Sequence, residues 1–258
     1  MTGHTPDRPI GHDDQRGIAG RVALVTGASG GIGTALVARL LTEGVTVIAS
    51  SRRPNIPALD KLADTADQSR LHVVQADMSH PDDLTTLVRR VEEEHGRLDL
   101  LLPNAGVAEV RTLENLSLAE WQQSIDVNLT APFLLAQAAV AGMRERRFGR
   151  ILFTSSVAAY VGGFVGPHYA AAKAGLHGLV HFLSNRLAAE GITANAIAPA
   201  LIEDTAMIAG LAGAGPRPSV PVGRFGRPDE VADLAVAVLS NGYLTGQVLL
   251  LDGGLYPN

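Results

Sequence analysis

Short apolar runs alternate with longer amphipathic or alanine-rich runs from Arg21 to the end of the chain. The short runs have the length and β-branched content of strands, and the longer runs repeat apolar residues at helical spacing. This pattern predicts strands at residues 22–26, 45–49, 71–75, 98–102, 150–154, 192–198 and 247–252. It predicts helices at residues 33–41, 118–146, 168–190 and 229–240, and another that begins near Ser79.

Three residues refine the ends of these helices. Pro132 lies inside the longest one and is expected to kink or break it, because proline lacks the backbone N–H and clashes with the preceding turn. Ser79 is predicted to cap its helix, with Pro81 in the first turn.

The alternation of strands and helices predicts parallel βαβ units that form one sheet. The strands are apolar on both faces, as at residues 98–102, so we expect helices on both sides of the sheet. The sequence therefore predicts a doubly wound, mostly parallel seven-stranded α/β domain, the Rossmann-like architecture, at residues 20–258. Residues 1–19 show no periodicity and are predicted to form a flexible polar tail.

Composition excludes several classes of protein. The 258 residues carry 21 Lys and Arg against 26 Asp and Glu, for a net charge of −5. The absence of Cys excludes disulfides and thiol chemistry, and eight unclustered His predict no metal site. We see no basic run for nucleic acid, no apolar run near the ~18 residues of a membrane helix, and no secretory signal. The expectation is a cytoplasmic protein.

A glycine-rich segment at residues 26–33 (TGASGGIG) lies between the first strand and the first helix. Glycines let the backbone approach a pyrophosphate, and the helix N-terminus offers free N–H groups to it. The spacing of Gly27, Gly31 and Gly33 is not G-x-G-x-x-G, and no Gly-Lys-Ser/Thr follows. We interpret the segment as a dinucleotide site, the alternative being a turn that binds no ligand.

The end of the second strand indicates which dinucleotide is preferred. It reads Ser50-Ser51-Arg52-Arg53 and has no carboxylate to accept from a ribose 2′-hydroxyl. An arginine there can hold a 2′-phosphate through charge-assisted hydrogen bonds. Arg52 therefore favours NADP(H) over NAD(H), the alternative being that both arginines are solvated loop residues.

Tyr169 and Lys173 are four residues apart on a predicted helix, so their side chains share one face. A phenol is a poor acid or base near neutral pH, and a nearby ammonium is expected to lower its pKa. Ser156 follows the fifth strand, where active groups of parallel sheets gather, and its hydroxyl could hold a carbonyl oxygen. Ser155 is the alternative serine.

The order and spacing of these motifs resemble the short-chain dehydrogenase/reductase family from about residue 21 to the end. The matching segments are the glycine-rich segment, Asn104-Ala105-Gly106, Asn128, Ser156, Tyr169-x-x-x-Lys173 and the Pro199 region. The resemblance implies a nicotinamide-dependent oxidoreductase that acts on a carbonyl or an alcohol, and homotetramers are usual among such proteins. A substrate lid is expected at residues 206–220.

The resemblance also implies a role for each matching residue. Tyr169 would be the general acid, Ser156 would orient the carbonyl, Lys173 would bind the nicotinamide ribose, and Asn128 would hold the water of a proton relay. The implied cofactor contacts are Gly27, Ser29, Gly31, Ile32, Gly33, Arg52, Asp77, Met78, Asn104, Ala105, Gly106, Tyr169, Lys173, Pro199, Ile202 and Thr205.

The chain departs from the family pattern at three places. Pro103 stands before Asn104 where the family has Asn, which removes a backbone donor. Ala200 follows Pro199 where Gly is usual, and Ala fits there only if its φ is negative. Thr205 comes one residue later than usual.

Within the family the chain is most similar to 3-oxoacyl-[acyl carrier protein] reductases, which implies reduction of a ketone in an acyl thioester. Arg147 matches one carrier-docking position of those enzymes, but Glu190 reverses the charge at a second. A free ketone or a coenzyme A thioester is therefore an alternative substrate. Two further hypotheses are an alcohol dehydrogenase and a catalytically silent nucleotide-binding regulator, although the latter would usually have lost Ser156, Tyr169 or Lys173.

Overall fold

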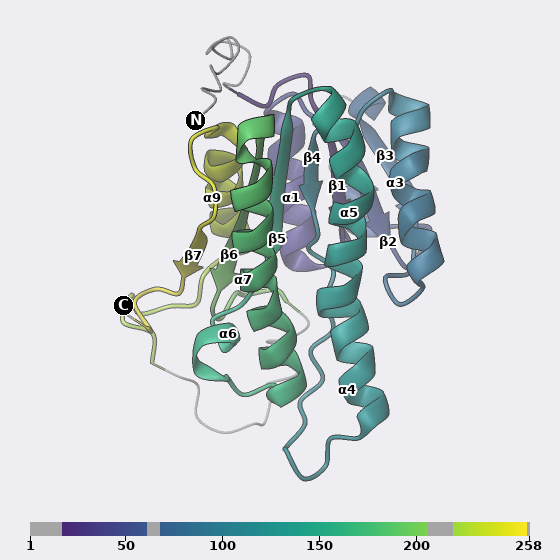
Figure 1. The fold of residues 1–258 in the computed structure, drawn as a ribbon. Helices are drawn as coiled ribbons and strands as arrows, with labels where there is room; N and C mark the ends of the chain where they lie inside the picture. Colours follow the sequence, from purple (N-terminus) through teal and green to yellow (C-terminus); the bar gives the residue numbers. More distant parts are fainter. Residues whose placement is uncertain (1–16, 61–67, 206–218, 257–258) are drawn as a thin grey trace, which may run out of the picture.

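Seven parallel strands form one sheet in the order β3-β2-β1-β4-β5-β6-β7 (Figure 1). The structure is a computed structural model that describes residues 17–60, 68–205 and 219–256. The strand order reverses between β1 and β4, so the predicted doubly wound sheet is confirmed. The strands are β1 Val22–Thr26, β2 Thr46–Ser51, β3 Leu71–Gln75, β4 Leu100–Leu102, β5 Gly149–Thr154, β6 Ile192–Pro199 and β7 Val248–Leu251.

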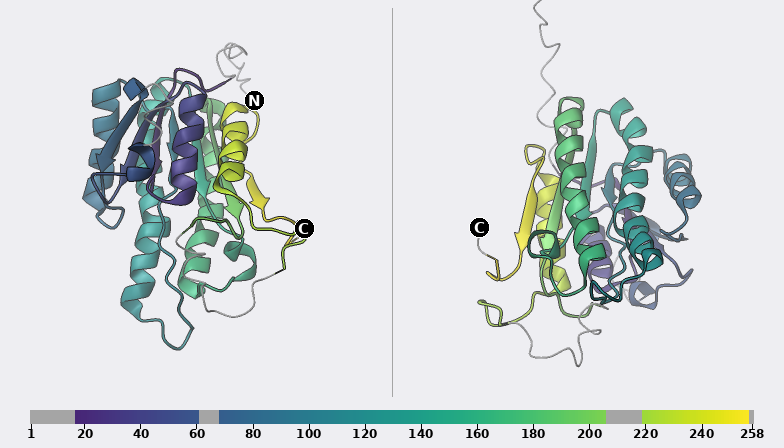
Figure 2. Two further views of the ribbon diagram at one scale, coloured as in Figure 1. Left: turned by 180° about the vertical axis from the view of Figure 1, so that it is seen from behind. Right: turned by 60° about the horizontal axis from the view of Figure 1, so that its bottom comes forward.

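Helices cover both faces of the sheet, as the apolar strands predicted. Helices α1 and α9 pack together on one face, and α3, α5 and α7 lie on the other (Figures 1 and 2). The helices are α1 Gly31–Thr42, α2 Pro57–Asp60, α3 Pro81–His95, α4 Leu118–Ile125, α5 Ala131–Glu145, α6 Ala158–Val161, α7 Pro167–Leu187 and α9 Pro228–Ser240. The sequence did not predict the short helices α2 and α6.

The long helix predicted at residues 118–146 is interrupted close to Pro132. Helix α4 passes through a π-helical turn, Asp126–Thr130, into α5, and Pro132 occupies the first turn of α5. Proline is tolerated there because the first N–H groups of a helix have no intrahelical partner. The π turn contains Asn128, and π turns often mark functional positions.

Most element boundaries shift by one to a few residues from the predicted ones, and two differences near the ends of elements correct an expectation. Helix α3 is capped by His80 rather than Ser79, although Pro81 does occupy its first turn. The Ser79 hydroxyl and amide both donate to the Asp77 carboxylate, at 2.8 and 2.9 Å, so this hydroxyl serves a local turn instead of a cap. Ile18 falls within the predicted tail, but it is buried in the core beside α1.

One stretch, Leu118–Glu145, is long and apolar enough by composition to cross a membrane, contrary to the expectation that none would be. Part of it is buried here against α3, α7 and the sheet, and a core helix passes the same test of length and composition. It is the one such stretch in the described ranges.

The amino end of the sheet contains buried charged residues. Asp99, just before β4, is fully buried and accepts from Val22 N at 3.1 Å and from the Arg97 guanidinium at 2.9 Å. Arg150 of β5 is also buried, and it donates to the backbone oxygens of Leu239, Gly149 and Gly191. Burial lowers the pKa of Arg150 to about 10.

Candidate active site

Ser156, Tyr169 and Lys173 come together at the carboxyl end of the sheet. Ser156 follows β5, and the other two lie one turn apart on α7. All three are buried, with 7%, 5% and 3% of their surface exposed. The Lys173 ammonium lies 5.7 Å from the centre of the Tyr169 ring, and the Ser156 side chain is near enough to Tyr169 to act on its pKa as a hydrogen-bonding group. The helical spacing of the pair therefore places both groups in one site.

Burial dominates the titration of this site. It raises the pKa of Tyr169 to about 12, and the hydrogen bond with Ser156 only partly opposes it. Burial also lowers the pKa of Lys173 to about 8, and its Nζ donates to Thr154 O at 2.7 Å. The predicted lowering of the Tyr169 pKa is therefore absent from the protein alone, because desolvation of the phenolate outweighs the opposing effect of the Ser156 side chain.

Asn128 is fully buried behind these residues, and its side chain is occupied. Its Nδ2 donates to Val107 O and to Ser124 Oγ, at 3.0 and 3.1 Å, and its Oδ1 accepts from Val107 N. A Cβ on Gly106 would lie 2.8 Å from Asn128 Oδ1 and 3.6 Å from Lys173 Nζ. Asn128 and Lys173 therefore border the same glycine.

The glycine-rich segment is held by the loop that follows β4. Thr26 Oγ1 accepts from the amides of Asn104 and Ala105, both at 3.1 Å, and Asn104 Nδ2 donates to Thr26 O. Gly27 has a φ of +67°, and a Cβ there would lie 2.7 Å from Ala105 Cα. A side chain at Gly27 is therefore excluded both by conformation and by space.

This segment fits the phosphates of a dinucleotide. Helix α1 begins after Gly30 with no side-chain cap and no acidic residue in its first turn. Its first N–H groups and the positive end of its dipole can therefore serve an anion. Gly31, Ile32 and Gly33 form that first turn, and Ser29 is exposed beside it.

Arg52 and Arg53 lie at the end of β2 with exposed side chains and a fixed backbone. Gln75 Nε2 donates to Arg52 O at 3.0 Å, and Ser51 Oγ donates to Arg53 O. The pKa of Asp77 is lowered mainly by its hydrogen bond from the Ser79 backbone, with Arg52 as a smaller cause. Arg52 and Asp77, two predicted cofactor residues, are thus neighbours.

The side chains of Met78 and Ile202, two predicted cofactor contacts, do not line the site. Both side chains are buried in the apolar clusters beside the sheet. The Ile202 backbone is engaged as well, because Ile202 O accepts from Thr205 Oγ1 and the residue forms a bridge with Gly226. The structure therefore does not present either side chain as a surface for a ligand.

The extra residue after β6 is accommodated at Asp204. In the described part of the chain, Asp204 and Arg147 are the non-glycine residues with a positive φ, so Ala200 meets the condition set for it. Thr205 Oγ1 donates to Ile202 O at 2.8 Å, which closes a tight turn. Asp204 O lies so near Gly31 that a Cβ there would be 2.4 Å away. The loop after Pro199 therefore touches the glycine-rich segment.

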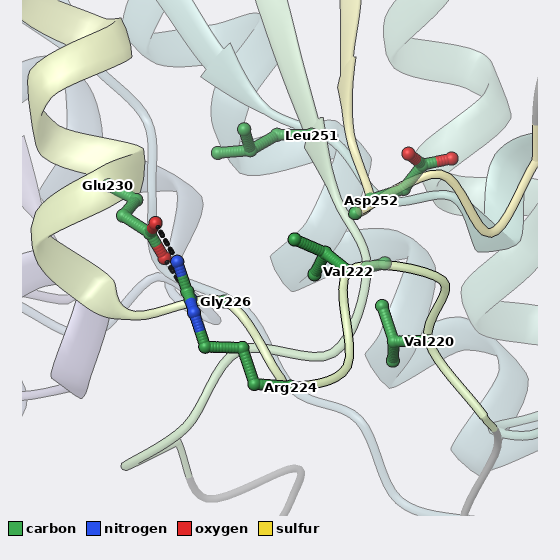
Figure 3. A pocket seen from close by; sticks show the side chains of 9 residues that line it. Val220, Val222, Arg224, Gly226, Glu230, Leu251 and Asp252 are labelled. Atoms are coloured by element: carbon green, nitrogen blue, oxygen red, sulfur yellow. Dashed lines mark hydrogen bonds and ion pairs between the residues drawn. The ribbon is translucent and has the colours of Figure 1, made fainter.

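A small hollow lies beside this loop at the ends of β6 and β7 (Figure 3). Val220, Val222 and Leu251 line it, and Arg224 pairs with Glu230 at its edge, at 2.6 Å. The three candidate catalytic side chains are not among its lining residues. The predicted lid lies outside the described residues except for positions 219 and 220.

Sequence reasoning missed the residues that support the site from behind. Ser124 makes a hydrogen bond to Asn128, and His177 makes one to Ser155. Thr26 belongs to the glycine-rich motif, but its role in holding the loop after β4 was not predicted. Ser155, the alternative to Ser156, donates to Lys173 O and so belongs to this supporting group. A lone Thr, Ser or His carries no spacing signal that could have identified it. No group of His, Asp and Glu in the described ranges could hold a metal ion.

Comparison with known proteins decides the family. The pattern of the short chain dehydrogenase family matches residues 21–213. The chain belongs to that family. It is 38% identical to acetoacetyl-CoA reductase of Allochromatium vinosum over 245 residues, which cover 92% of this chain and 98% of that one. It is 35% identical to the 3-oxoacyl-[acyl-carrier-protein] reductase of Escherichia coli, with the same two coverages.

A solved structure gives the same result for this short chain dehydrogenase. A protein from Beutenbergia cavernae, assigned as an NAD(P)-dependent gluconate 5-dehydrogenase and crystallised with NADP at low occupancy, superposes with a TM-score of 0.84. The two are 30% identical, and the match covers 92% of this chain and 97% of that one. The Rossmann-like fold is therefore confirmed both by topology and by comparison.

Proposed function

We propose that this protein reduces the ketone of a 3-oxoacyl thioester to a secondary alcohol with NADPH. The observation that carries the proposal is the meeting of Ser156, Tyr169 and Lys173 beside an uncapped glycine-rich helix start. The two reductases to which the chain is similar act on such thioesters by their names, acetoacetyl-CoA for one and 3-oxoacyl-carrier protein for the other.

The chain's own residues supply position and a proton. The Ser156 side chain lies near enough to Tyr169 to act on its pKa, so a ketone oxygen that bridged the two hydroxyls would be polarised by both. Tyr169 stays protonated at neutral pH, since its pKa is about 12, and can give its proton to the alkoxide oxygen. NADPH supplies the hydride when bound. Lys173 would hold the nicotinamide ribose, and its ammonium would stabilise the phenolate left on Tyr169.

Asn128 would support reprotonation of Lys173. Its side chain is occupied by Val107 and Ser124, so we infer that it would hold a relay water through its main chain. The π turn supports this, because it interrupts the regular backbone hydrogen bonding of α4 and α5 at that residue.

The preference for NADPH rests on Arg52. Its backbone is fixed by Gln75, its guanidinium is exposed, and Asp77, the nearby carboxylate, already accepts from Ser79. A 2′-phosphate would meet an exposed guanidinium at this position. The predicted contacts at Asn104, Ala105, Gly106 and Pro199 would follow the cofactor along the sheet toward Tyr169.

The surface around Glu190 offers less attraction to an acidic carrier protein than two free arginines would. Glu190 pairs with Arg144 at 2.5 Å, and the Arg147 guanidinium donates to Ala189 O. The Glu190 carboxylate therefore offsets the charge of Arg144, whereas Arg147 keeps its charge because Ala189 O is a neutral acceptor. Less net positive charge is left for an acidic partner than two unpaired arginines would give.

Assembly is inferred from the family and location from composition. A homotetramer is the expectation from the family, and α5 and α7 lie beside each other on one face of the sheet (Figure 1). A cytoplasmic location stays a prediction from composition.

The test is loss of NADPH absorbance with acetoacetyl-CoA as substrate. We expect turnover that prefers NADPH to NADH and that Tyr169→Phe abolishes, with NADPH binding retained in the variant. Binding of NADPH without turnover of the thioester would reject this substrate class. Gluconate and simple ketones then become the substrates to try, since the solved neighbour is assigned as a gluconate dehydrogenase.

A further inference from the structure

Ser155 binds the helix that carries Lys173. Its amide donates to Ile197 O of β6 at 2.7 Å, so its backbone is fixed within the sheet. Its hydroxyl lies 3.1 Å from Lys173 O and 2.9 Å from His177 Nε2. The side chain is buried, so these contacts are shielded from water.

The direction of these hydrogen bonds follows from a single proton. The Ser155 hydroxyl has one hydrogen, which it donates to Lys173 O. His177 must then donate its Nε2–H to Ser155 Oγ. Two hydrogen bonds in series therefore connect the His177 ring, through the Ser155 hydroxyl, to the backbone of Lys173.

A third element joins this series of contacts. The ring of Tyr160 lies 4.9 Å from that of His177, and Tyr160 belongs to α6, which follows Ser156 directly. Ser155, Tyr160 and His177 therefore connect the segment that carries Ser156 to the helix that carries Tyr169 and Lys173.

We propose that Ser155 and His177 are positioning residues. They hold α7 in the position relative to Ser156 from which the Lys173 ammonium can contact both the Tyr169 hydroxyl and the nicotinamide ribose. The inference rests on the proposed roles of Tyr169 and Lys173. Lys173 has a long, flexible side chain, so the position of its ammonium depends on how well its backbone is held. The Ser155 hydroxyl holds that backbone at the Lys173 carbonyl oxygen. Anchoring that oxygen to Ser155, directly after β5, limits the movement of the ammonium relative to Ser156.

Three titratable groups surround His177. Tyr160 faces it from α6, while Lys173 and His181 lie one turn before and one turn after it on α7. Burial and the charge of His181 lower the pKa of His177, so the ring is neutral at pH 7.5. Its single proton then lies on Nε2, which faces Ser155.

Four variants of the full-length enzyme distinguish the effect of the His177 N–H donor from the effect of the His177 ring. Ser155→Ala removes the central hydroxyl, and His177→Phe keeps a ring against Tyr160 but removes the donor. His177→Gln keeps an N–H within reach of Ser155 but removes the ring. His181→Phe is the matched control, because it changes an exposed His one turn further along α7.

We expect Ser155→Ala and His177→Phe to lower kcat for oxidation of 3-hydroxybutyryl-CoA by on the order of tenfold, the effect of losing one buried hydrogen bond. The KM for the thioester should change less than twofold. The pH at which oxidation becomes half-maximal should rise by about 0.5 to 1 unit, because a displaced ammonium stabilises the Tyr169 phenolate less. His177→Gln and His181→Phe should keep the wild-type profile.

A purely structural role would give a different result. If Ser155→Ala and His177→Phe lowered the melting temperature but kept kcat and the pH profile, the proposal would be wrong. It would also be wrong if His177→Gln lost as much activity as His177→Phe.

Two measurements need no thioester, so they test the inference even if the protein does not reduce the proposed substrate. Nitrogen-15 NMR of the wild type should show neutral His177 with its proton on Nε2, and Ser155→Ala should change that signal. NADPH fluorescence should show weaker binding, by about three- to tenfold, in Ser155→Ala and His177→Phe. A proton on Nδ1, or unchanged binding in both variants, overturns the inference. Absence of turnover in the wild type and in His181→Phe would instead count against the proposed function.

Discussion

The two ends of the sheet both bury charged or ionisable groups, but they treat them in opposite ways. At the amino end, Asp99 receives hydrogen bonds from Val22 and Arg97, and Arg150 donates to three backbone oxygens. At the carboxyl end, burial shifts the pKa of Tyr169 to about 12 and that of Lys173 to about 8. The first arrangement stabilises the fold, whereas the second leaves acid and base ready for a substrate and a cofactor.

The largest expected effect is at the carboxyl end. Tyr169→Phe removes the proton donor without removing the ring, so we expect kcat for thioester reduction to fall by about 10³-fold. The melting temperature and the Kd for NADPH should stay close to wild type. Stopped-flow or steady-state absorbance of NADPH measures kcat, and NADPH fluorescence measures the Kd. A variant that keeps a tenth of wild-type kcat would contradict the assignment of Tyr169.

The amino end should respond in stability instead. Asp99→Ala leaves the buried N–H of Val22 and the Arg97 guanidinium without their acceptor, which we expect to cost about 3 kcal/mol of the free energy of unfolding. Urea denaturation measures it, and kcat per folded molecule should not change. Glu93→Ala is the control, because its pair with Arg89 is exposed, and its urea midpoint should match wild type.

Burial of the Lys173 ammonium at the carboxyl end lowers the free energy of unfolding, and this effect can be measured. Its pKa falls from 10.5 to about 8 on folding, so at pH 7 it is charged in both states and its burial destabilises the fold. Lys173→Met should therefore raise the unfolding free energy at pH 7 by on the order of 2 kcal/mol, even after losing the bond to Thr154 O. The variant should have no activity.

The sign of the pH dependence follows from the same shift. Between pH 8 and pH 10.5 the unfolded chain binds more protons at Lys173 than the folded one does, so wild-type stability rises with pH relative to the variant. The difference in urea midpoint between the two proteins should therefore be smaller at about pH 10 than at about pH 7. A Lys173→Met protein that is less stable than wild type at neutral pH would refute this account.

The smallest expected effect lies at the adenosine end of the proposed cofactor site. Arg52→Ala should weaken NADPH binding by about tenfold and leave NADH binding unchanged, because only NADPH carries the 2′-phosphate. Arg53→Ala, which changes the neighbouring arginine, is the matched control and should have a smaller effect. An equal loss for both cofactors would show that Arg52 supports the loop rather than the phosphate.

The sequence predicted features that repeat locally, and it missed those that depend on distant contacts. Strands β1 and β3 match their predictions to the residue, since β-branched runs define them, and the helical spacing of Tyr169 and Lys173 placed both in one site. The direction of the Tyr169 pKa shift was wrong for the protein alone, because burial is not visible in a residue list. Ser155 meets His177 only after β5 and α7 have packed together.

The hydrogen bonds from Asn104 and Ala105 to Thr26 have a consequence for how such an enzyme can be divided. They join the half of the sheet that would carry the phosphates and adenosine to the half that carries the reacting groups. A fragment that stops after β3 would keep the glycine-rich segment but lose the two amides that hold Thr26. The segment therefore cannot be transplanted as a self-contained module, because the loop after β4 must accompany it to supply those two amides.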